Sequence, residues 1–300
     1  MDYQKSLKEA KEQNKALLLF FTGSDWSGPC MQMKKESLDS SHFQKQIQQA
    51  FICVEVDFPK HTILDEALQR QNLELKESFY ITDFPCLVLL NQEEQEIGRF
   101  FSAASHEKLA GELVHLAATD ASLQQGLQSL EVLDAEGLIS LFYMAEQLDN
   151  QKARDALIQQ GCASDEASFF LVEAYRSFVQ QGATQQAEQI RGQLEEAAAG
   201  EQKIAYSLAL IDFQDLAGKS GQEANPDCIV EPLKNYLHFF GEVDLENSWR
   251  VEMMIAQVYL SADACEKAHE FAKRAYERAP VAFKGEISHS LDYISSHSIR

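Results

Sequence analysis

The chain has 300 residues, which is more than one domain usually holds, so the sequence predicts two domains. Hydrophobic residues make up 45% and charged residues 24%, which is the composition of a soluble protein with sizeable cores. The 47 acidic against 26 basic residues give a formal charge of -21, which repels phosphate backbones and anionic lipids. This charge argues against nucleic-acid and membrane partners, and it favours basic partners in a salt-dependent way.

The sequence also bears on location. No stretch reaches the length of a membrane span, and residues 1–15 are charged, without the apolar core of a signal peptide. The sequence as written therefore predicts a cytoplasmic protein, or a periplasmic one if Met1 replaces a removed signal sequence.

Residues 1 to about 118 alternate between helix and strand patterns. The sequence predicts strands over 16–21, 51–56, 86–90 and 96–101. Helices are predicted over 2–14, 30–49, 63–78 and 105–118, with a break in the second near Asp39 and with Ser105 as the N-cap of the last. Alternating units of this kind predict a mixed sheet with helices on both faces.

From about residue 120 the strand patterns disappear. Glycine and proline residues separate helices predicted over 122–133, 135–149, 151–160, 165–181, 183–199, 201–218, 227–240, 245–261, 264–279 and 281–296. Helices in pairs of similar length indicate repeats that stack side by side. The predicted organisation is thus an α/β domain over 1–118 and an all-α, helical-repeat-like domain over 119–300.

The last helix pair has the clearest pattern. Small residues at Ala256, Ala268 and Ala275 allow two helices to approach closely, Tyr259 fills the space between units, and Pro280 ends the pair. This spacing resembles a tetratricopeptide repeat, without the usual large residue near position 272. The earlier pairs resemble that family only in length, so the domain is predicted to be tetratricopeptide-like. The resemblance implies a protein partner on the helical repeats.

Six cysteines are spread widely, with no Cys-x-x-Cys pair and no metal-like cluster, and the eight histidines also lack metal-ligand spacing. We therefore expect no metal site and no cofactor. Most of the cysteines are expected to be reduced, buried apolar residues. Cys30 differs, because it lies in the motif Trp26-Ser27-Gly28-Pro29-Cys30 between a buried strand and a helix.

This motif resembles the Trp-Cys-Gly-Pro-Cys active site of thioredoxins, with Ser27 in place of the first cysteine. The match extends along the first hundred residues and in register, through the segments Phe21-Thr22-Gly23-Ser24-Asp25, Val56-Asp57-Phe58-Pro59, Gln71-Asn72, Tyr80-Ile81-Thr82-Asp83-Phe84-Pro85 and Ile97-Gly98-Arg99. The chain therefore resembles bacterial thioredoxin-like proteins of the disulfide-isomerase type. The resemblance implies a thioredoxin fold for the N-terminal domain.

The resemblance also implies roles for individual residues. Ser27 stands where the attacking cysteine belongs, and Cys30 stands where the resolving cysteine belongs. Pro85 matches the cis-proline that aligns substrate, with Phe84 before it. Trp26 is expected to shield the site, and Gly28 and Pro29 to set the turn into the helix. Phe20 or Phe21 occupies the place of the buried aspartate that helps proton transfer in many thioredoxins.

Two interpretations of Cys30 stay open. A helix N-terminus stabilises a thiolate, which favours a reactive monothiol, whereas the second cysteine position is usually shielded, which favours an inert one. Cys86 directly follows Pro85 and is a possible second thiol. A serine hydroxyl cannot form a mixed disulfide, so rapid dithiol reduction is not expected.

Two functional hypotheses follow. In the first, the protein is a thiol–disulfide exchange protein of the isomerase type that uses Cys30, acts on protein or peptide substrates and forms mixed disulfides with them. In the second, it is a non-catalytic scaffold that binds peptides in the groove around Trp26, Phe84 and Pro85 and binds a protein partner on the helical repeats. The sequence favours the first as the family function and keeps the second as the alternative.

Overall fold

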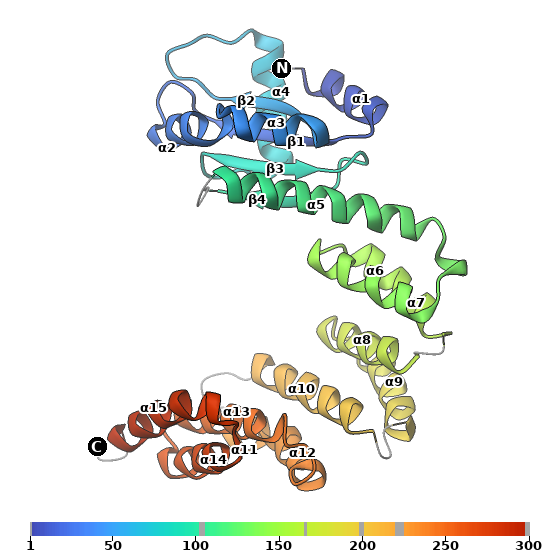
Figure 1. Cartoon of the computed structure of the whole chain (residues 1–300), viewed down its shortest axis with the longest axis vertical. Helices are drawn as coiled ribbons and strands as arrows, with labels where there is room; N and C mark the ends of the chain where they lie inside the picture. The colour runs from blue at the N-terminus through green and yellow to red at the C-terminus, as the bar shows by residue number, and fades with distance from the viewer. Residues whose placement is uncertain (1, 102–105, 165–166, 198–200, 220–224, 298–300) are drawn as a thin grey trace. The chain divides into compact units, whose positions relative to one another are not determined.

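A four-stranded mixed sheet forms the centre of the N-terminal part of the chain in the computed structural model (Figure 1). The structure describes residues 2–101, 106–164, 167–197, 201–219 and 225–297. The chain divides into two compact units, Met1–Gly161 and Cys162–Arg300.

The sheet has the strand order β2-β1-β3-β4. Strand β1 (Ala16–Thr22) pairs in parallel with β2 (Phe51–Asp57) and antiparallel with β3 (Cys86–Leu90), which pairs antiparallel with β4 (Glu96–Phe100). The two parallel strands end in register, with Thr22 opposite Asp57. The predicted mixed sheet is therefore confirmed, and the segments that follow Thr22 and Asp57 emerge at the same edge.

Helices cover both faces of this sheet. One face packs against α1 (Tyr3–Gln13) and α4 (Glu66–Ser78) through a buried apolar cluster that includes Leu7, Phe21 and Leu75. The opposite face lies under α3 (Ser41–Ala50), whose buried Phe43 and Ile47 point inward. Strands β1 and β3 are continuous apolar runs buried on both sides, as a sheet covered on both faces requires.

The predicted second helix is divided into three parts. Helix α2 (Gly28–Met33) continues into a π-helical turn, η1 (Lys34–Leu38), and α3 follows after Asp39 and Ser40. The hydroxyl of Ser40 accepts the backbone N–H of Phe43 and so begins α3. The predicted break near Asp39 is confirmed.

The helix predicted to close the α/β domain at residue 118 is longer than expected. Helix α5 runs without a break over His106–Leu127, so the predicted separate helix over 122–133 is wrong. Asp120 is buried and accepts side-chain N–H groups of Asn91 and Gln124, and therefore does not begin a new helix. The predicted domain boundary after residue 118 falls within α5 and stays a prediction, and Ser105 lies outside the described residues.

The rest of the described chain is helical. The first unit ends with η2 (Leu130–Val132), α6 (Ala135–Gln147) and α7 (Gln151–Gly161). The second unit contains α8 (Ala167–Gln180), α9 (Thr184–Ala197), α10 (Gln202–Lys219), α11 (Pro226–Ile229), α12 (Glu231–Phe240), α13 (Ser248–Ser261), α14 (Cys265–Arg278) and α15 (Val281–His297). The all-α C-terminal region is confirmed, although the helix predicted over 227–240 is divided at Val230.

The last helix pair packs as its small residues predict. Ala256, Ala268 and Ala275 are at most 1% exposed between α13 and α14, and Tyr259 is fully buried beside them. The alanines permit close approach of the two helices, whose burial stabilises the pair. Membership in the tetratricopeptide family stays a prediction.

Among the described residues, no helix combines the length and the apolar character that a membrane crossing needs.

Two carboxyl groups are buried among the described residues of this helical unit, those of Asp244 and Glu252. Glu252 on α13 is 2% exposed, its Oε1 lies 3.5 Å from Nη1 of Arg278, and its Oε2 has no hydrogen-bond partner among the described residues. Burial raises the pKa of Glu252 to about 7. Arg278 and Arg274 oppose this shift, while Glu242 and Glu277 add to it.

We expect the stability of the protein to fall as the pH rises from about 4.5 to about 7, because the folded state keeps the Glu252 proton that the unfolded chain loses. The loss is about 3 kcal/mol at most, since one pKa unit corresponds to ~1.36 kcal/mol. This loss of stability is measured by urea unfolding of wild type and Glu252→Gln, followed by circular dichroism at pH values on either side of this window. The stability of Glu252→Gln should not fall with pH in this way, whereas that of Glu266→Gln, changed at an exposed position, should fall as in the wild type. Equal pH dependence in wild type and Glu252→Gln would contradict the prediction.

Candidate active site at the turn before helix α2

Ser27 begins helix α2 as its N-cap. Its backbone is extended, and its hydroxyl oxygen accepts the backbone N–H of Cys30 at 3.4 Å. Gly28 and Pro29 form the exposed first turn, where a proline costs no hydrogen bond because the first helical N–H groups have no partner in the helix. Serine at this position therefore has a structural role, and its side chain is 6% exposed.

The Cys30 thiol lies inside the turn. Cys30 is 1% exposed, and its Sγ accepts the backbone N–H of Gly23 at 3.4 Å. The amide hydrogen bond holds the sulfur at the first turn of α2. The burial opposes access by a substrate, so the reactivity of this thiol depends on what covers it.

Trp26 packs against the glycine that contacts this thiol. A Cβ atom on Gly23 would lie 2.4 Å from Cε2 of Trp26, so only glycine leaves room for the indole. The indole Nε1–H donates to the carbonyl oxygen of Phe58 at 2.7 Å, and the ammonium of Lys60 lies 4.0 Å from the ring centroid. These two contacts hold Trp26 over the turn, while its side chain stays 38% exposed.

Further hydrogen bonds join the turn after β1 to the loop after β2. The Asp25 carboxylate accepts the backbone N–H groups of Lys60, His61 and Thr62 at 2.7 to 3.0 Å. These hydrogen bonds, led by that of Lys60, lower the pKa of Asp25. Ser24 donates its backbone N–H and its hydroxyl to Asp57 at 2.9 and 2.5 Å. Residues 24–26 are thus fixed along the segment 57–62, and we call this contact the loop seam.

An aromatic surface adjoins the seam. The ring of Phe84 lies 6.1 Å from that of Trp26 and 5.2 Å from that of Phe58, and the Lys76 ammonium lies 5.6 Å from the Phe84 centroid. The peptide bond between Phe84 and Pro85 is cis. Trp26 and Phe84, predicted to belong to one groove, are therefore neighbours in the structure.

Cys86 is placed differently. It is fully buried in the apolar cluster beneath α1 and α4, and burial raises the pKa of its thiol to about 11. Cys30 and Cys86 are both free thiols in the structure. A thiol that stays protonated at neutral pH is a poor nucleophile, so Cys86 is a weak candidate for a second active-site thiol.

The structure assigns roles to residues that had none in the sequence pattern. Asp25, Asp57, Phe58 and Lys60 fix the position of Trp26, although only the first three lie in segments that carry the thioredoxin resemblance. The order of these segments along the sequence does not reveal that their side chains bond across the site. Among the described residues, no group of three or more His, Cys, Asp or Glu side chains is arranged to hold a metal ion.

Comparison with known proteins agrees with the fold of the N-terminal part. Residues 3–117 match the family model described as a thioredoxin-like domain. The chain belongs to the thioredoxin-like family of thiol–disulfide oxidoreductases. Its sequence is 37% identical over 305 residues to the thioredoxin-related protein DsbJ of Chlamydia pneumoniae, a match that covers 99% of this chain and 87% of that protein.

Other known proteins match a smaller share of this chain. The disulfide bond reductase DsbH of Chlamydia pneumoniae is 37% identical over 97 residues, which cover 32% of this chain and 58% of that protein. A solved structure of the DsbH oxidoreductase is 31% identical and covers 39% of this chain and 83% of that one, with a TM-score of 0.38. A thioredoxin from Thermus thermophilus is 17% identical and covers 42% and 92% of the two chains, with a TM-score of 0.34.

The position of Trp26 leads to a prediction about access to Cys30. Trp26→Phe keeps an aromatic ring but removes the indole hydrogen bond to Phe58, which is worth about 1 kcal/mol. We expect the population of opened turns, and with it the alkylation rate of Cys30, to rise about fivefold. Iodoacetamide labelling resolved by peptide mass spectrometry measures this rate. The exposed Cys228 provides the control in the same sample, because its rate should not change. An unchanged rate at Cys30 would show that Trp26 does not control access.

Proposed function

We propose that the N-terminal unit is a thiol–disulfide exchange module that works with a single active-site thiol, Cys30. The observation that supports this most directly is the surroundings of its sulfur atom. The thiol lies in the first turn of α2, accepts an amide N–H from Gly23, and sits next to the aromatic surface of Trp26 and Phe84. A protein or peptide with a disulfide is the expected substrate.

The proposed reaction is a thiol–disulfide exchange without net oxidation or reduction. The Cys30 thiolate attacks one sulfur of a substrate disulfide, a Cys30–substrate disulfide forms, and the substrate S–S bond breaks to release a substrate thiolate that takes up a proton. Ser27 has no thiol with which to resolve this mixed disulfide. A thiol of the substrate therefore attacks it, so the product is a rearranged disulfide and the net oxidation state does not change.

This single-thiol cycle accounts for one of the two departures of the site from the thioredoxin motif. Ser27 retains the cap that begins α2 while it removes the dithiol reaction. Phe20 and Phe21 are both buried apolar side chains, and one of them stands where many thioredoxins have an aspartate. Cys30 therefore has no carboxylate there to take its proton, which slows the attack but does not change its products. Substrates with disulfides occur in oxidising compartments, so the proposal favours the periplasmic of the two locations considered from the sequence.

A second candidate function rests on the burial of Cys30. At 1% exposure, the thiol is closed to solvent, and the aromatic surface around Trp26, Phe84 and Pro85 can bind an extended peptide without any covalent step. In this alternative the thioredoxin fold is a binding module and Cys30 packs as a small apolar residue.

One experiment separates the two candidates. The probe is a peptide with an internal disulfide, compared with the same sequence in which both cysteines are alanine. In the exchange function, wild type forms a mixed disulfide that survives denaturing, non-reducing electrophoresis, and Cys30→Ala does not. In the scaffold function, both proteins bind both peptides equally in a fluorescence anisotropy titration, and no adduct forms. An adduct that persists in Cys30→Ala would assign the chemistry to another cysteine and contradict the proposal.

A second prediction restores the missing thiol. In Ser27→Cys, a second sulfur stands at the start of α2 and can resolve the mixed disulfide, so we expect catalysed reduction of insulin disulfides by dithiothreitol to rise about tenfold or more. Ser27→Ala serves as the matched control, because it loses the cap but gains no thiol; it should lose about 1 kcal/mol of stability and gain no activity. Turbidity of precipitating insulin chains follows the reaction. If Ser27→Cys is folded but no more active than Ser27→Ala, then the missing nucleophile is not what limits this site.

A further inference from the structure

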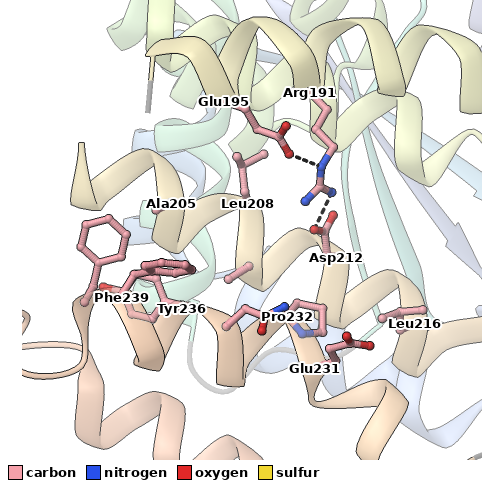
Figure 2. A pocket seen from close by; sticks show the side chains of 13 residues that line it. Arg191, Glu195, Ala205, Leu208, Asp212, Leu216, Glu231, Pro232, Tyr236 and Phe239 are labelled. Carbon is pink, nitrogen blue, oxygen red and sulfur yellow. Dashed lines mark hydrogen bonds and ion pairs between the residues drawn. The ribbon is translucent and has the colours of Figure 1, made fainter. Parts of the chain in front are cut away.

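The helical unit contains a groove between α9, α10 and α12, with a volume of about 400 Å³ (Figure 2). Its floor is one face of α10, which carries Ala205, Leu208 and Ala209. Leu208 and Ala209 are largely buried, and the two alanines are too short to fill the space above them. The floor is therefore apolar and able to accept a side chain from outside.

A network of hydrogen bonds forms one wall of the groove. The Arg191 guanidinium donates to Asp212 at 2.6 Å, to the hydroxyl of Tyr175 at 2.9 Å and to Glu195 at 2.7 Å, and Tyr175 donates to Asp212 at 2.5 Å. Figure 2 shows Arg191 between the two carboxylates. The positive charge is thus already paired, so this wall is fixed in shape and does not attract an anionic ligand.

The opposite wall has groups that are not paired. Helix α12 carries Glu231, Asn235 and Phe239 along the groove. The exposed side chains of Glu231 and Asn235 have no hydrogen bond or ion pair to any residue that the structure describes. The ring of Phe239 is 74% exposed. This wall therefore offers an exposed apolar ring, a carboxylate and an amide that are all free to contact a partner.

The charges of the groove select the class of ligand. Three carboxylates, those of Glu195, Asp212 and Glu231, line it together with the single guanidinium of Arg191. This local excess of negative charge has the same sign as the charge of the whole chain, -21. Both therefore repel nucleic acid and a second copy of this chain, and both favour a cationic partner.

We propose that this groove binds a cationic segment of another protein, with a large apolar side chain over the floor of α10 against Phe239 and a neighbouring Lys or Arg paired with Glu231. The amide of Asn235 is placed to hydrogen-bond with the backbone of such a segment. Apolar burial supplies the affinity, and the carboxylates supply the selectivity for basic sequences. The proposal does not depend on the chemistry of Cys30.

A cysteine-free library of displayed 12-residue peptides tests the proposal on the full-length protein. The Cys30→Ser background prevents capture through a disulfide. We expect the selected peptides to contain Lys or Arg beside a large apolar residue. The affinity of a selected peptide should fall about tenfold in Glu231→Lys, which removes the ion pair, and about tenfold in Phe239→Ala, which removes the apolar contact. Added salt should weaken the binding to the wild type, because it screens the ion pair.

Glu266→Lys is the matched control. Glu266 lies in the first turn of α14, as Glu231 lies in the first turn of α12, so both substitutions place a cation at a helix N-terminus and change the net charge equally. Only Glu231 lines the groove. Circular dichroism establishes that all variants are folded before binding is compared.

Three outcomes would overturn the proposal. The first is a selection that does not enrich basic and apolar residues together. The second is a selected peptide that binds Glu231→Lys and Phe239→Ala as tightly as it binds the Glu266→Lys control. The third is a concentration-dependent dimer in sedimentation analysis that Glu231→Lys dissociates, since the occupant of the groove would then be a second copy of the chain.

Discussion

The parallel pairing of β1 with β2 is the constraint on which the candidate site depends. Parallel strands deliver their C-terminal ends to the same edge of a sheet, and the register sets Thr22 opposite Asp57. The backbone N–H of Phe58 then donates to the carbonyl of Thr22, and the loop seam forms beyond this bond. Without that register, the indole of Trp26 would find no carbonyl acceptor, and the turn that holds Cys30 would not be covered.

In this turn, residue 27 has a structural role as the N-cap of α2, which is distinct from the chemical role of the first cysteine in thioredoxins. A hydroxyl oxygen is a better acceptor for a backbone N–H than a thiol sulfur, so serine is a good N-cap, whereas only a thiolate attacks a disulfide. Ser27 fulfils the first task and cannot fulfil the second. Serine at this position therefore preserves the start of α2, and it leaves Cys30 as the single thiol of the turn.

The sequence predicts features that depend on local pattern, and it predicts less where distant side chains meet. The strands and the position of Phe84 follow from apolar runs and from motif spacing. Asp25 is an example of a contact that the sequence does not predict. Its carboxylate accepts three backbone N–H groups more than thirty residues away, and no periodicity in the sequence indicates these hydrogen bonds. Asp120 shows the same limit, because its hydrogen bond from Asn91 lies within a continuous helix where the sequence predicts a boundary between two helices. The groove beside α10 likewise depends on tertiary packing of three helices.

A covered single thiol and a peptide-binding groove have complementary kinetics. When access to Cys30 requires the indole of Trp26 to move, each encounter with a substrate disulfide has a low chance of reaction, and a longer residence time compensates for this. A second binding site on one chain raises the effective concentration of a substrate only where both sites can be occupied together. The groove proposed beside Glu231 and the thiol proposed at Cys30 therefore raise separate questions, one of affinity and one of chemistry, and the loss of either leaves the other intact.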